Sequence, residues 1–396
     1  MKFISQEFEQ QPIPPCPVRK KCAGCQLTNL SYEEQLAMKQ SRVIKLLGDF
    51  CHVRPIIGMD NPYHYRNKVQ AAFGTTRSGK LISGVYQSKD GRIVAVDHCQ
   101  IENEAADVII CTIRKLLKAF KLTAYNAYTN RGFLRHVLIR YAAATGEILV
   151  SLVAATPVFP SKNAFIKQLL RAHPEITTIV FGVSTDEKAL IQPKRETILY
   201  GSGYITDHLC GLDFRITATS FYQVNPIQTE VLYKTAMDFA KLTGTETVID
   251  AYCGVGTIGL IAAPAAKHVT GVETNGEAVK NAIRNARANG IKNATFVHGD
   301  AGKFMTELSN AGEHVDLVFM DPPRAGSDRA FLSSVAKLQP NRIVYISCNP
   351  ETQKRDLQFL TRHGYRVREI QPVDMFPHTN HVETVVLMTR TNAGKV

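Results

Sequence analysis

Two side chains near the C-terminal end of the chain have the types and positions needed for covalent catalysis. Cys348 lies in RIVYISCNP, after an apolar strand-like run and just before a helix that Asn349 and Pro350 can start. Unpaired backbone N–H groups and the helix dipole favour a thiolate there, although most free cysteines are inert core residues. Glu383, in HTNHVETVVLM, begins another apolar run and could act as a base, although a surface acid is the commoner case at a strand end. The pair predicts nucleophilic catalysis assisted by a general base.

A glycine-rich turn, AYCGVGTIGL, follows the strand-like segment TVID and precedes a helical segment. Gly254, Gly256 and Gly259 fit G-x-G-x-x-G, in which glycine lets the backbone turn tightly and approach a ligand closely. Glu273 ends the next strand-like segment, where a carboxylate can accept the hydroxyl protons of an adenosine ribose. The motif fits both NAD and S-adenosylmethionine (SAM). Asp250, just before the loop, would oppose a pyrophosphate but suit a sulfonium or ammonium group, so its charge favours SAM.

Two further acids follow strand-like segments in the same part of the chain. Asp300 closes FVHGD and could reach an adenine, although a solvated acid is equally expected there. Asp321, in VDLVFMDPPR, precedes two prolines that stiffen the turn and fix the direction of its carboxylate. A thiolate, a base and a methyl donor together could alkylate a pyrimidine: the thiolate adds to C6, C5 attacks the methyl group, and the base removes the C5 proton.

A separate group of cysteines lies in the N-terminal segment CPVRKKCAGCQ. Cys16, Cys22 and Cys25 have the spacing C-x5-C-x2-C, and Cys99, in VDHCQ, can be a fourth ligand. Four thiolates suit either Zn²⁺ or an iron–sulfur cluster, and the spacing alone does not decide between them. The group lies outside the nucleotide-binding half, which favours a structural role.

The elements that must position these residues change in pattern near residue 220. From about 60 to 215, short strand-like segments alternate with turns, interrupted by helical segments at about 102–120 and 161–172. After about 220, strands and helices alternate, which indicates a doubly wound, mostly parallel sheet whose ligands bind beyond the carboxyl ends of the strands. The last two strand-like segments, YRVREIQPVDMF and VETVVLMTR, could form an antiparallel pair at the sheet edge.

An amphipathic helix is expected over residues 31–48. Ser31 and Glu34 have the spacing of a capping box, and Gly48 can end the helix. The apolar residues that fall near helical spacing are Leu36, Val43, Ile44 and Leu47.

Composition indicates a folded protein with a polyanionic partner. The 396 residues are 44% apolar and 21% charged, which excludes a disordered chain, and 47 Lys+Arg against 35 Asp+Glu give a net charge of +12. Residues 17–80 hold eleven basic residues and four acids, and YHYRNKVQ interleaves aromatic and basic side chains, as in proteins that bind single-stranded RNA. No membrane-spanning run or secretory signal is present, so we expect a cytoplasmic protein with no membrane partner, whose cysteines serve metal binding or catalysis.

Together these motifs resemble those of the bacterial RNA uracil-5-methyltransferase family over nearly the whole chain. The resemblance implies an α/β fold, with a Rossmann-like SAM-dependent methyltransferase domain over residues 220–396. Residues 1–219 would carry the metal-cluster loop and a β-rich central α+β domain that binds RNA. Within them, residues 28–59 are expected to pack on the catalytic domain, leaving 60–219 as the central domain. The enzyme is expected to be a monomer.

The resemblance also assigns roles to individual residues. SCNP and HVET match the family's nucleophile and general-base segments, which implies these roles for Cys348 and Glu383. SFYQVNPIQTE and DPPR match segments of its SAM site. The implied SAM-site residues are Gln223, Tyr252, Glu273 and Asp321, to which Asp300 is added by its position. The N-terminal signature implies a [4Fe-4S] cluster rather than zinc, held by Cys16, Cys22, Cys25 and Cys99.

The length of the N-terminal segment bears on the target RNA. Many members begin with an OB-like RNA-binding domain, whereas this chain reaches its first cluster cysteine at residue 16. The resemblance is therefore closest to the shorter cluster-bearing enzymes that form 5-methyluridine in 23S ribosomal RNA. Transfer-RNA members usually lack the cluster and fit less well. The uridine must be unpaired or flipped, because a C5 inside a helix is out of reach of a pocketed cysteine. Two alternatives of other classes stay open: an NAD-dependent oxidoreductase, and a non-catalytic iron–sulfur protein that binds RNA.

Overall fold

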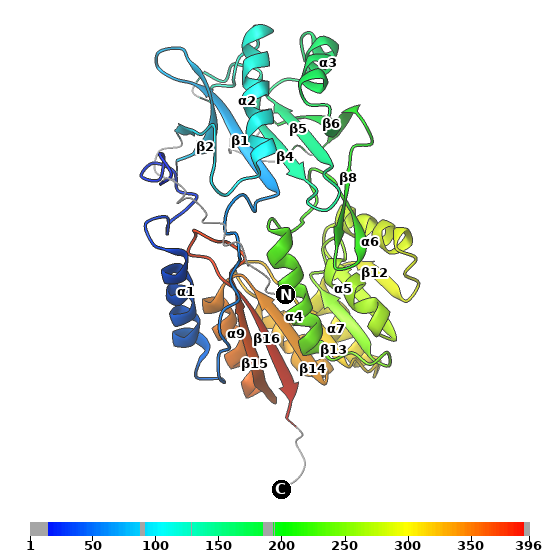
Figure 1. Ribbon diagram of the computed structural model, residues 1–396. Helices are drawn as coiled ribbons and strands as arrows, with labels where there is room; N and C mark the ends of the chain where they lie inside the picture. The colour runs from blue at the N-terminus through cyan, green and yellow to red at the C-terminus, as the bar shows by residue number, and fades with distance from the viewer. Residues whose placement is uncertain (1–14, 88–91, 128, 185–192, 194, 392–396) are drawn as a thin grey trace, which may run out of the picture.

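Two seven-stranded sheets dominate the computed structural model, which describes residues 15–87, 92–127, 129–184, 193 and 195–391. In Figure 1 the central sheet, from residues 68–200, lies in the upper half, and the C-terminal sheet, from residues 247–390, lies in the lower half. None of the helices in this described part of the chain has the length and apolar character needed to cross a bilayer.

The C-terminal sheet is mostly parallel. Its strands, in the order in which they lie side by side, are β12 (Ala294–His298), β11 (His268–Glu273), β10 (Thr247–Ala251), β13 (Leu317–Met320), β14 (Arg342–Ser347), β16 (Glu383–Arg390) and β15 (Tyr365–Val373). The first five are parallel, and β16 is inserted antiparallel between β14 and β15. The predicted doubly wound sheet with an antiparallel pair at its edge is therefore confirmed.

Helices cover both faces of this sheet. One face packs against α4 (Pro226–Ala240), α5 (Thr257–Ala262) with the short helix η1 (Ala263–Ala265), and α6 (Gly276–Ala288). The other packs against α7 (Ala301–Asn310), α8 (Arg329–Leu338) and α9 (Pro350–Arg362). Along β13, Leu317 and Phe319 point to the first face and Val318 and Met320 to the second, and all four are fully buried. A strand covered on both sides must be apolar throughout, which explains the unbroken hydrophobic run.

The predicted N-terminal helix is present as α1 (Tyr32–Leu47), and its capping box is formed. The Glu34 N–H donates to Ser31 Oγ over 3.2 Å, and the Ser31 N–H donates to Glu34 Oε2 over 2.7 Å. These two bonds satisfy backbone donors that the first turn would otherwise leave unpaired. The helix ends at Gly48, as expected.

Helix α1 packs beside α9 on the second face of the C-terminal sheet (Figure 1). Val43 and Leu47 are fully buried there, whereas Ile44, which falls near the same spacing, is 49% exposed. After the helix, Val53 forms a bridge to Ile370 of β15. Residues near the start of the chain thus line the edge of a sheet formed by its last residues.

The central sheet is mostly antiparallel. Its strands, in spatial order, are β3 (Ile93–Ala95), β2 (Leu81–Tyr86), β1 (Lys68–Thr75), β4 (Leu134–Tyr141), β5 (Ile148–Ala154), β6 (Ile176–Val183) and β7 (Glu196–Tyr200). Only β5 and β6 pair in parallel, and α3 (Lys162–Ala172) connects them. Together with α2 (Glu104–Ala119), α3 buries one face of the sheet, so both helices expected in this region are confirmed.

A hairpin that the sequence pattern did not reveal joins the two halves. It consists of β8 (Ile205–Leu209) and β9 (Leu212–Ile216), and its turn residues Cys210 and Gly211 have φ values of 50° and 83°. Such a pair of positive φ angles is the favoured geometry of a two-residue hairpin turn. The hairpin packs against α4, and the side chains of Asn285 on α6 and of Asn289, which follows the helix, accept hydrogen bonds from the backbone of β9.

Candidate active site

The glycine-rich turn lies between β10 and α5, at the carboxyl edge of the C-terminal sheet. Gly254 and Gly256 have φ values of +56° and +85°, which other residues rarely adopt, and the space beside Gly254 is open within 4 Å. The Gly254 N–H donates to Glu273 Oε2 over 3.1 Å, and the Gly259 N–H donates to Asp250 Oδ2 over 2.8 Å. The two acids therefore fix the conformation of the turn, in which the space beside Gly254 is open to a ligand.

Asp250 is fully buried, and burial raises the pKa of its carboxyl to about 7. Its second oxygen, Oδ1, is also buried and has no hydrogen-bond partner among the described residues. A buried oxygen of this kind fits a cationic ligand group better than a pyrophosphate. The electrostatics therefore agree with SAM and not with NAD.

Three of the predicted SAM-site residues line one pocket of about 500 Å³: Tyr252, Glu273 and Asp300. Tyr252 has a φ of 63°, an uncommon value for a large side chain, and its ring lies 4.9 Å from that of Phe331 in the pocket wall. Asp300 caps α7 by accepting a hydrogen bond from the Lys303 N–H over 2.8 Å. Gln223 and Asp321 lie outside the lining of this pocket.

Cys348 and Glu383 meet at the same edge of the sheet because β16 runs antiparallel to β14. Ser347 at the end of β14 pairs with Thr384 of β16, so the next positions outward are Cys348 and Glu383. Glu383 is 3% exposed, and burial together with the charge of Asp321 raises its pKa to about 8. Burial, followed by the charges of Glu383 and Asp321, raises the pKa of the half-buried Cys348 thiol to about 11.

The DPPR turn after β13 completes this cluster. Burial raises the pKa of Asp321 to about 7. The positive charge of Arg324 acts in the opposite direction and lowers the pKa of both Cys348 and Glu383. Asn349, which caps α9, donates a hydrogen bond over 3.1 Å to the backbone oxygen of Arg324, and so ties the turn to the residue after the cysteine.

Gln223 lies on the segment that leads into α4, and the central sheet holds this segment in place. The Asn67 side chain donates to Gln223 O over 3.2 Å, and the Asn67 N–H donates to Val224 O over 2.9 Å. The Gln223 side chain bonds to the hydroxyl of Tyr233, which lies 3.4 Å from Thr257 Oγ1 at the start of α5. Gln223 is thereby connected to the helix that follows the glycine-rich turn.

Sequence reasoning missed Tyr233 and Arg324. Tyr233 is 2% exposed, and the nearby charges of Asp321 and Asp250 help burial to raise its pKa. It occupies an ordinary core position of an amphipathic helix, so no local signal could have revealed it. Arg324 follows Asp321 by three residues in the DPPR motif, and this closeness in sequence could have indicated that its side chain lies near the reacting groups.

The four N-terminal cysteines, Cys16, Cys22, Cys25 and Cys99, line a second pocket. Burial raises the pKa of Cys22 and that of Cys25, the latter to about 12, and neighbouring thiols add to both shifts. The Gly24 N–H lies 3.3 Å from Cys22 Sγ, as expected for a donor that stabilises a thiolate. Nevertheless, in the residues that the structure describes, no group of three or more His, Cys, Asp or Glu side chains is arranged to hold a metal ion.

Comparison with known proteins identifies the family. The model of the tRNA (uracil-5-)-methyltransferase family matches residues 31–391. The chain belongs to this family. A protein of Halalkalibacterium halodurans described as an uncharacterized RNA methyltransferase is 44% identical over 383 residues, which are 96% of this chain and 83% of that protein. One of Clostridium acetobutylicum with the same description is 42% identical over 98% of this chain and 86% of its own length.

A solved structure extends the similarity to three dimensions. The tRNA (uracil-54, C5)-methyltransferase of Pyrococcus abyssi, in complex with S-adenosyl-L-homocysteine, has a TM-score of 0.79 and 28% identity to this chain. The match covers 94% of this chain and 86% of that protein.

Membership in the tRNA (uracil-5-)-methyltransferase family confirms that the chain is an RNA uracil-5-methyltransferase. It decides against the NAD-dependent oxidoreductase and against the non-catalytic binding protein. The product-bound structure of the Pyrococcus protein supports SAM as the methyl donor.

Proposed function

We propose that this enzyme methylates C5 of a specific uridine in 23S ribosomal RNA through a covalent bond between Cys348 and C6 of the base. The observation that carries the mechanism is the antiparallel register, which sets Cys348 and Glu383 at adjacent ends of neighbouring strands. A nucleophile and a base on two rigid strands keep a fixed separation, as the two-step reaction requires.

The two residues act in sequence. Cys348, as a thiolate, adds to C6 of uracil, and the electron pair displaced from the ring lets C5 form a bond to the methyl group of the sulfonium. Glu383 then removes the C5 proton, the ring double bond reforms, and the C6–S bond breaks with its electrons returning to Cys348. The net products are 5-methyluridine and S-adenosyl-L-homocysteine.

The electrostatics of the site favour a cationic donor. Asp321, Glu383 and Cys348 all have raised pKa values because burial opposes their negative forms, and the charge of Asp321 adds to the shifts of Glu383 and Cys348. A positive sulfonium placed among them would lower all three pKa values and promote the thiolate and the carboxylate base. SAM binding would therefore activate the cysteine as well as supply the methyl group.

The predicted SAM-site residues form two groups, one for the adenosine part of the ligand and one for the end that carries the methyl group. Tyr252, Glu273 and Asp300, which share the 500 Å³ pocket, would hold the adenosine. Gln223 and Asp321, both beside Tyr233, would hold the end that carries the methyl group. This division follows the path from the glycine-rich turn to the DPPR turn.

The cysteine pocket would hold a [4Fe-4S] cluster as a structural element. Four thiols share this pocket, and a backbone N–H already points to one sulfur, which fits a cluster. The cluster would hold the N-terminal loop together, with Cys16, Cys22, Cys25 and Cys99 as ligands. Zinc is the competing ion for the same four thiols.

Residues 1–219 would hold the RNA, with residues 220–396 as the catalytic domain. Among the described residues, Arg66 and Lys68 make no side-chain hydrogen bond or ion pair, and burial with the charges of Arg140 and Arg66 lowers the pKa of Lys68 to about 8. The Arg66 charge also acts on the Glu102 carboxyl, and cations crowded together in this way fit RNA phosphates. We expect the enzyme to act as a cytoplasmic monomer on an unpaired or flipped uridine.

A transfer RNA is the second candidate substrate, favoured by the named activity of the Pyrococcus relative. One experiment separates the two. Total RNA from a strain that lacks the gene is incubated with the protein and SAM labelled in its methyl group, and 5-methyluridine is mapped in 23S and transfer RNA. Label in a single 23S uridine supports the proposal, label in transfer RNA supports the alternative, and label outside uracil C5 contradicts both.

A further inference from the structure

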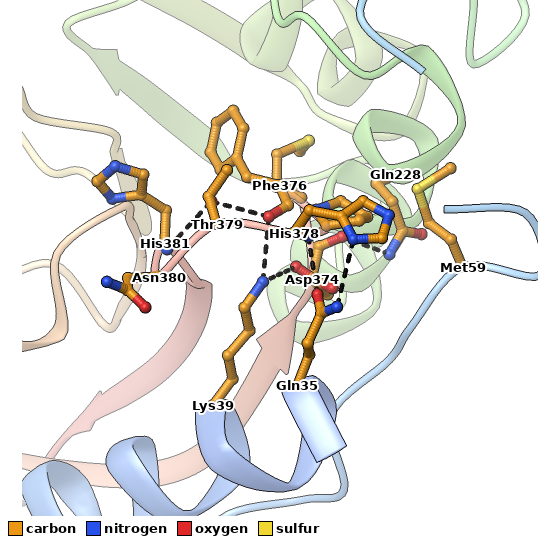
Figure 2. A network of polar contacts seen from close by, with 12 residues as sticks. Gln35, Lys39, Met59, Gln228, Asp374, Phe376, His378, Thr379, Asn380 and His381 are labelled. Atoms are coloured by element: carbon orange, nitrogen blue, oxygen red, sulfur yellow. Dashed lines mark hydrogen bonds and ion pairs between the residues drawn. The ribbon is translucent and has the colours of Figure 1, made fainter. Parts of the chain in front are cut away.

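A layer of buried polar side chains lies between α1 and the turn formed by residues 374–382 (Figure 2). Tyr32, Gln35 and Lys39 follow one another at helical spacing, so they share one face of α1. Gln35 and Lys39 are 0% and 1% exposed. The face of α1 that meets this turn is therefore polar, where a packed helix normally presents apolar residues.

The centre of this layer is an ion pair. Lys39 Nζ lies 2.6 Å from Asp374 Oδ1 and also donates to Phe376 O over 3.1 Å. The Tyr32 hydroxyl donates to Asp374 Oδ2 over 2.9 Å. Both charged side chains are essentially inaccessible to water, at 1% and 0% exposed.

The same turn is held at further points from two helices. Gln35 Oε1 accepts a hydrogen bond from the His378 N–H over 2.9 Å. From the first turn of α4, Gln228 Nε2 donates to Asp374 O over 3.0 Å, and Asn225 Nδ2 donates to Met375 O over 3.0 Å. The turn is thus clamped between α1 and the start of α4.

Stability alone does not explain a buried ion pair. Removing two charges from water is costly, and apolar residues of similar volume at such sites are often as stable or more stable. The presence of a buried ion pair at this position is better explained if the turn must be held in one conformation. The location of the turn indicates what that geometry serves.

The turn ends at the proposed general base. Val373 of β15 pairs with Glu383, the first residue of β16, and Asp374 directly follows Val373. The clamp therefore fixes the chain immediately beyond the pair that places Glu383. We propose that Lys39 and Asp374 are positioning residues that hold Glu383 where it can remove the C5 proton. This inference rests on the proposed function, because it assumes that role for Glu383.

The test separates the proton-removal step from the steps before it. The double variant Lys39→Met/Asp374→Leu keeps the volume of the pair and leaves no unpaired charge, whereas either single variant would leave one charge buried without its partner. We expect its turnover to fall by on the order of tenfold to a hundredfold. SAM affinity and kcat/KM for RNA should stay unchanged, because binding and methyl transfer precede the slowed step, and a covalent protein–RNA adduct should accumulate on denaturing gels.

RNA containing 5-fluorouridine measures the earlier steps, because its C5 carries no removable proton. The double variant should trap this RNA as fast as the wild type. A variant that turns over at the wild-type rate without excess adduct, or that traps fluorinated RNA as slowly as it turns over normal RNA, would overturn the positioning role. If the wild type itself traps no fluorinated RNA, the proposed covalent mechanism is wrong. That result differs from one in which the wild type traps the RNA and only the double variant behaves unexpectedly, which would contradict the positioning role alone.

A second ion pair provides the matched control. Arg342 Nη2 lies 3.1 Å from Glu246 Oε1 at the opposite edge of the same sheet, with side chains 21% and 9% exposed. The variant Arg342→Met/Glu246→Leu should change Tm about as much as Lys39→Met/Asp374→Leu does, but no covalent protein–RNA adduct should accumulate. Equal adduct in the control variant would mean that the effect is one of general loosening and would also contradict the proposal.

Discussion

The two cysteine sites of this molecule differ in the charges that surround their sulfurs. At the sheet edge, Cys348 stands alone, with two carboxyls that raise its pKa and one guanidinium, that of Arg324, that lowers it. In the N-terminal pocket, Cys22 and Cys16 raise the pKa of Cys25, and burial is the largest cause of the shift. Each site has a guanidinium nearby, since the Arg66 charge lowers the pKa of Cys25, but only in the second do neighbouring thiols oppose one another's ionisation.

The contrast indicates how each site can be completed. A single thiol needs one further positive charge, which a sulfonium would bring transiently, and it remains free to bond to a substrate. Several thiols in one pocket can all ionise only when a cation is shared among them, as in a metal or iron–sulfur site. The same side-chain type therefore serves chemistry at one site and, on our proposal, structure at the other.

Cys348→Ala gives the sharpest test of the first site. Without the nucleophile, methyl transfer should fall by roughly 10⁴-fold or more, while SAM binding measured by calorimetry stays intact. Cys111→Ala is the matched control, because burial also raises the pKa of this thiol and Arg114 also lowers it. Full activity in Cys348→Ala would show that Cys348 is not the nucleophile, and the contrast drawn between the two cysteine sites would no longer hold.

Glu383→Gln should have the next largest effect. Loss of the base should slow turnover by about 10²- to 10⁴-fold, and the Cys348–RNA adduct should persist because its C5 proton is no longer removed. Denaturing gels with labelled RNA measure the adduct as a slowed band. A variant that is slow but shows no such band, in wild-type yield of folded protein, would assign proton removal to another group.

Arg324→Met changes the charge balance at Cys348 without removing a reacting group. The Arg324 charge lowers the pKa of Glu383, which burial raises to about 8, and the base works only when deprotonated. Activity should therefore rise with pH in the wild type, and the variant should need a higher pH. A shift of one pKa unit would mean about tenfold less activity at pH 7, with recovery at higher pH.

The pH profile of kcat checks this expectation, since it reports groups of the enzyme–substrate complex, in which Glu383 removes the proton. Arg368→Met, a change on the exposed part of β15, is the control and should leave the profile unmoved. An unchanged profile in Arg324→Met would mean that this guanidinium does not tune the reacting groups.

The fold was largely predictable from local patterns. The strands after residue 220 are mostly apolar segments that alternate with helical ones, so their order along the chain predicted the parallel sheet. The insertion of β16 between β14 and β15 could not be derived, because antiparallel pairing depends on contacts far apart in sequence. That insertion is what brings Glu383 next to Cys348.

The polar contacts of the site were less predictable than its motifs. Helical periodicity in α1 pointed to its apolar residues, yet Lys39 is buried and Ile44 is 49% exposed. The reason is that Asp374, more than three hundred residues away in the chain, supplies the partner that makes burial of the lysine possible. Tyr233 was missed for a similar reason, since its polar contacts come from other elements.

Cys22→Ser tests the second site and should have the smallest effect on catalysis. The loop bonds to the turn before Glu383 through the backbone and one amide side chain, from the Leu27 N–H to His378 O over 3.0 Å and from the Asn380 N–H to Gln26 Oε1 over 3.2 Å. We expect a lower Tm and loss of bound iron and sulfide, with methyl transfer reduced only severalfold. Anaerobic purification with iron, sulfide and zinc analysis measures the cofactor directly. A colourless wild type that carries zinc would replace the cluster by a zinc site, and a wild type with neither would mean that four clustered thiols can stay protonated without a shared cation.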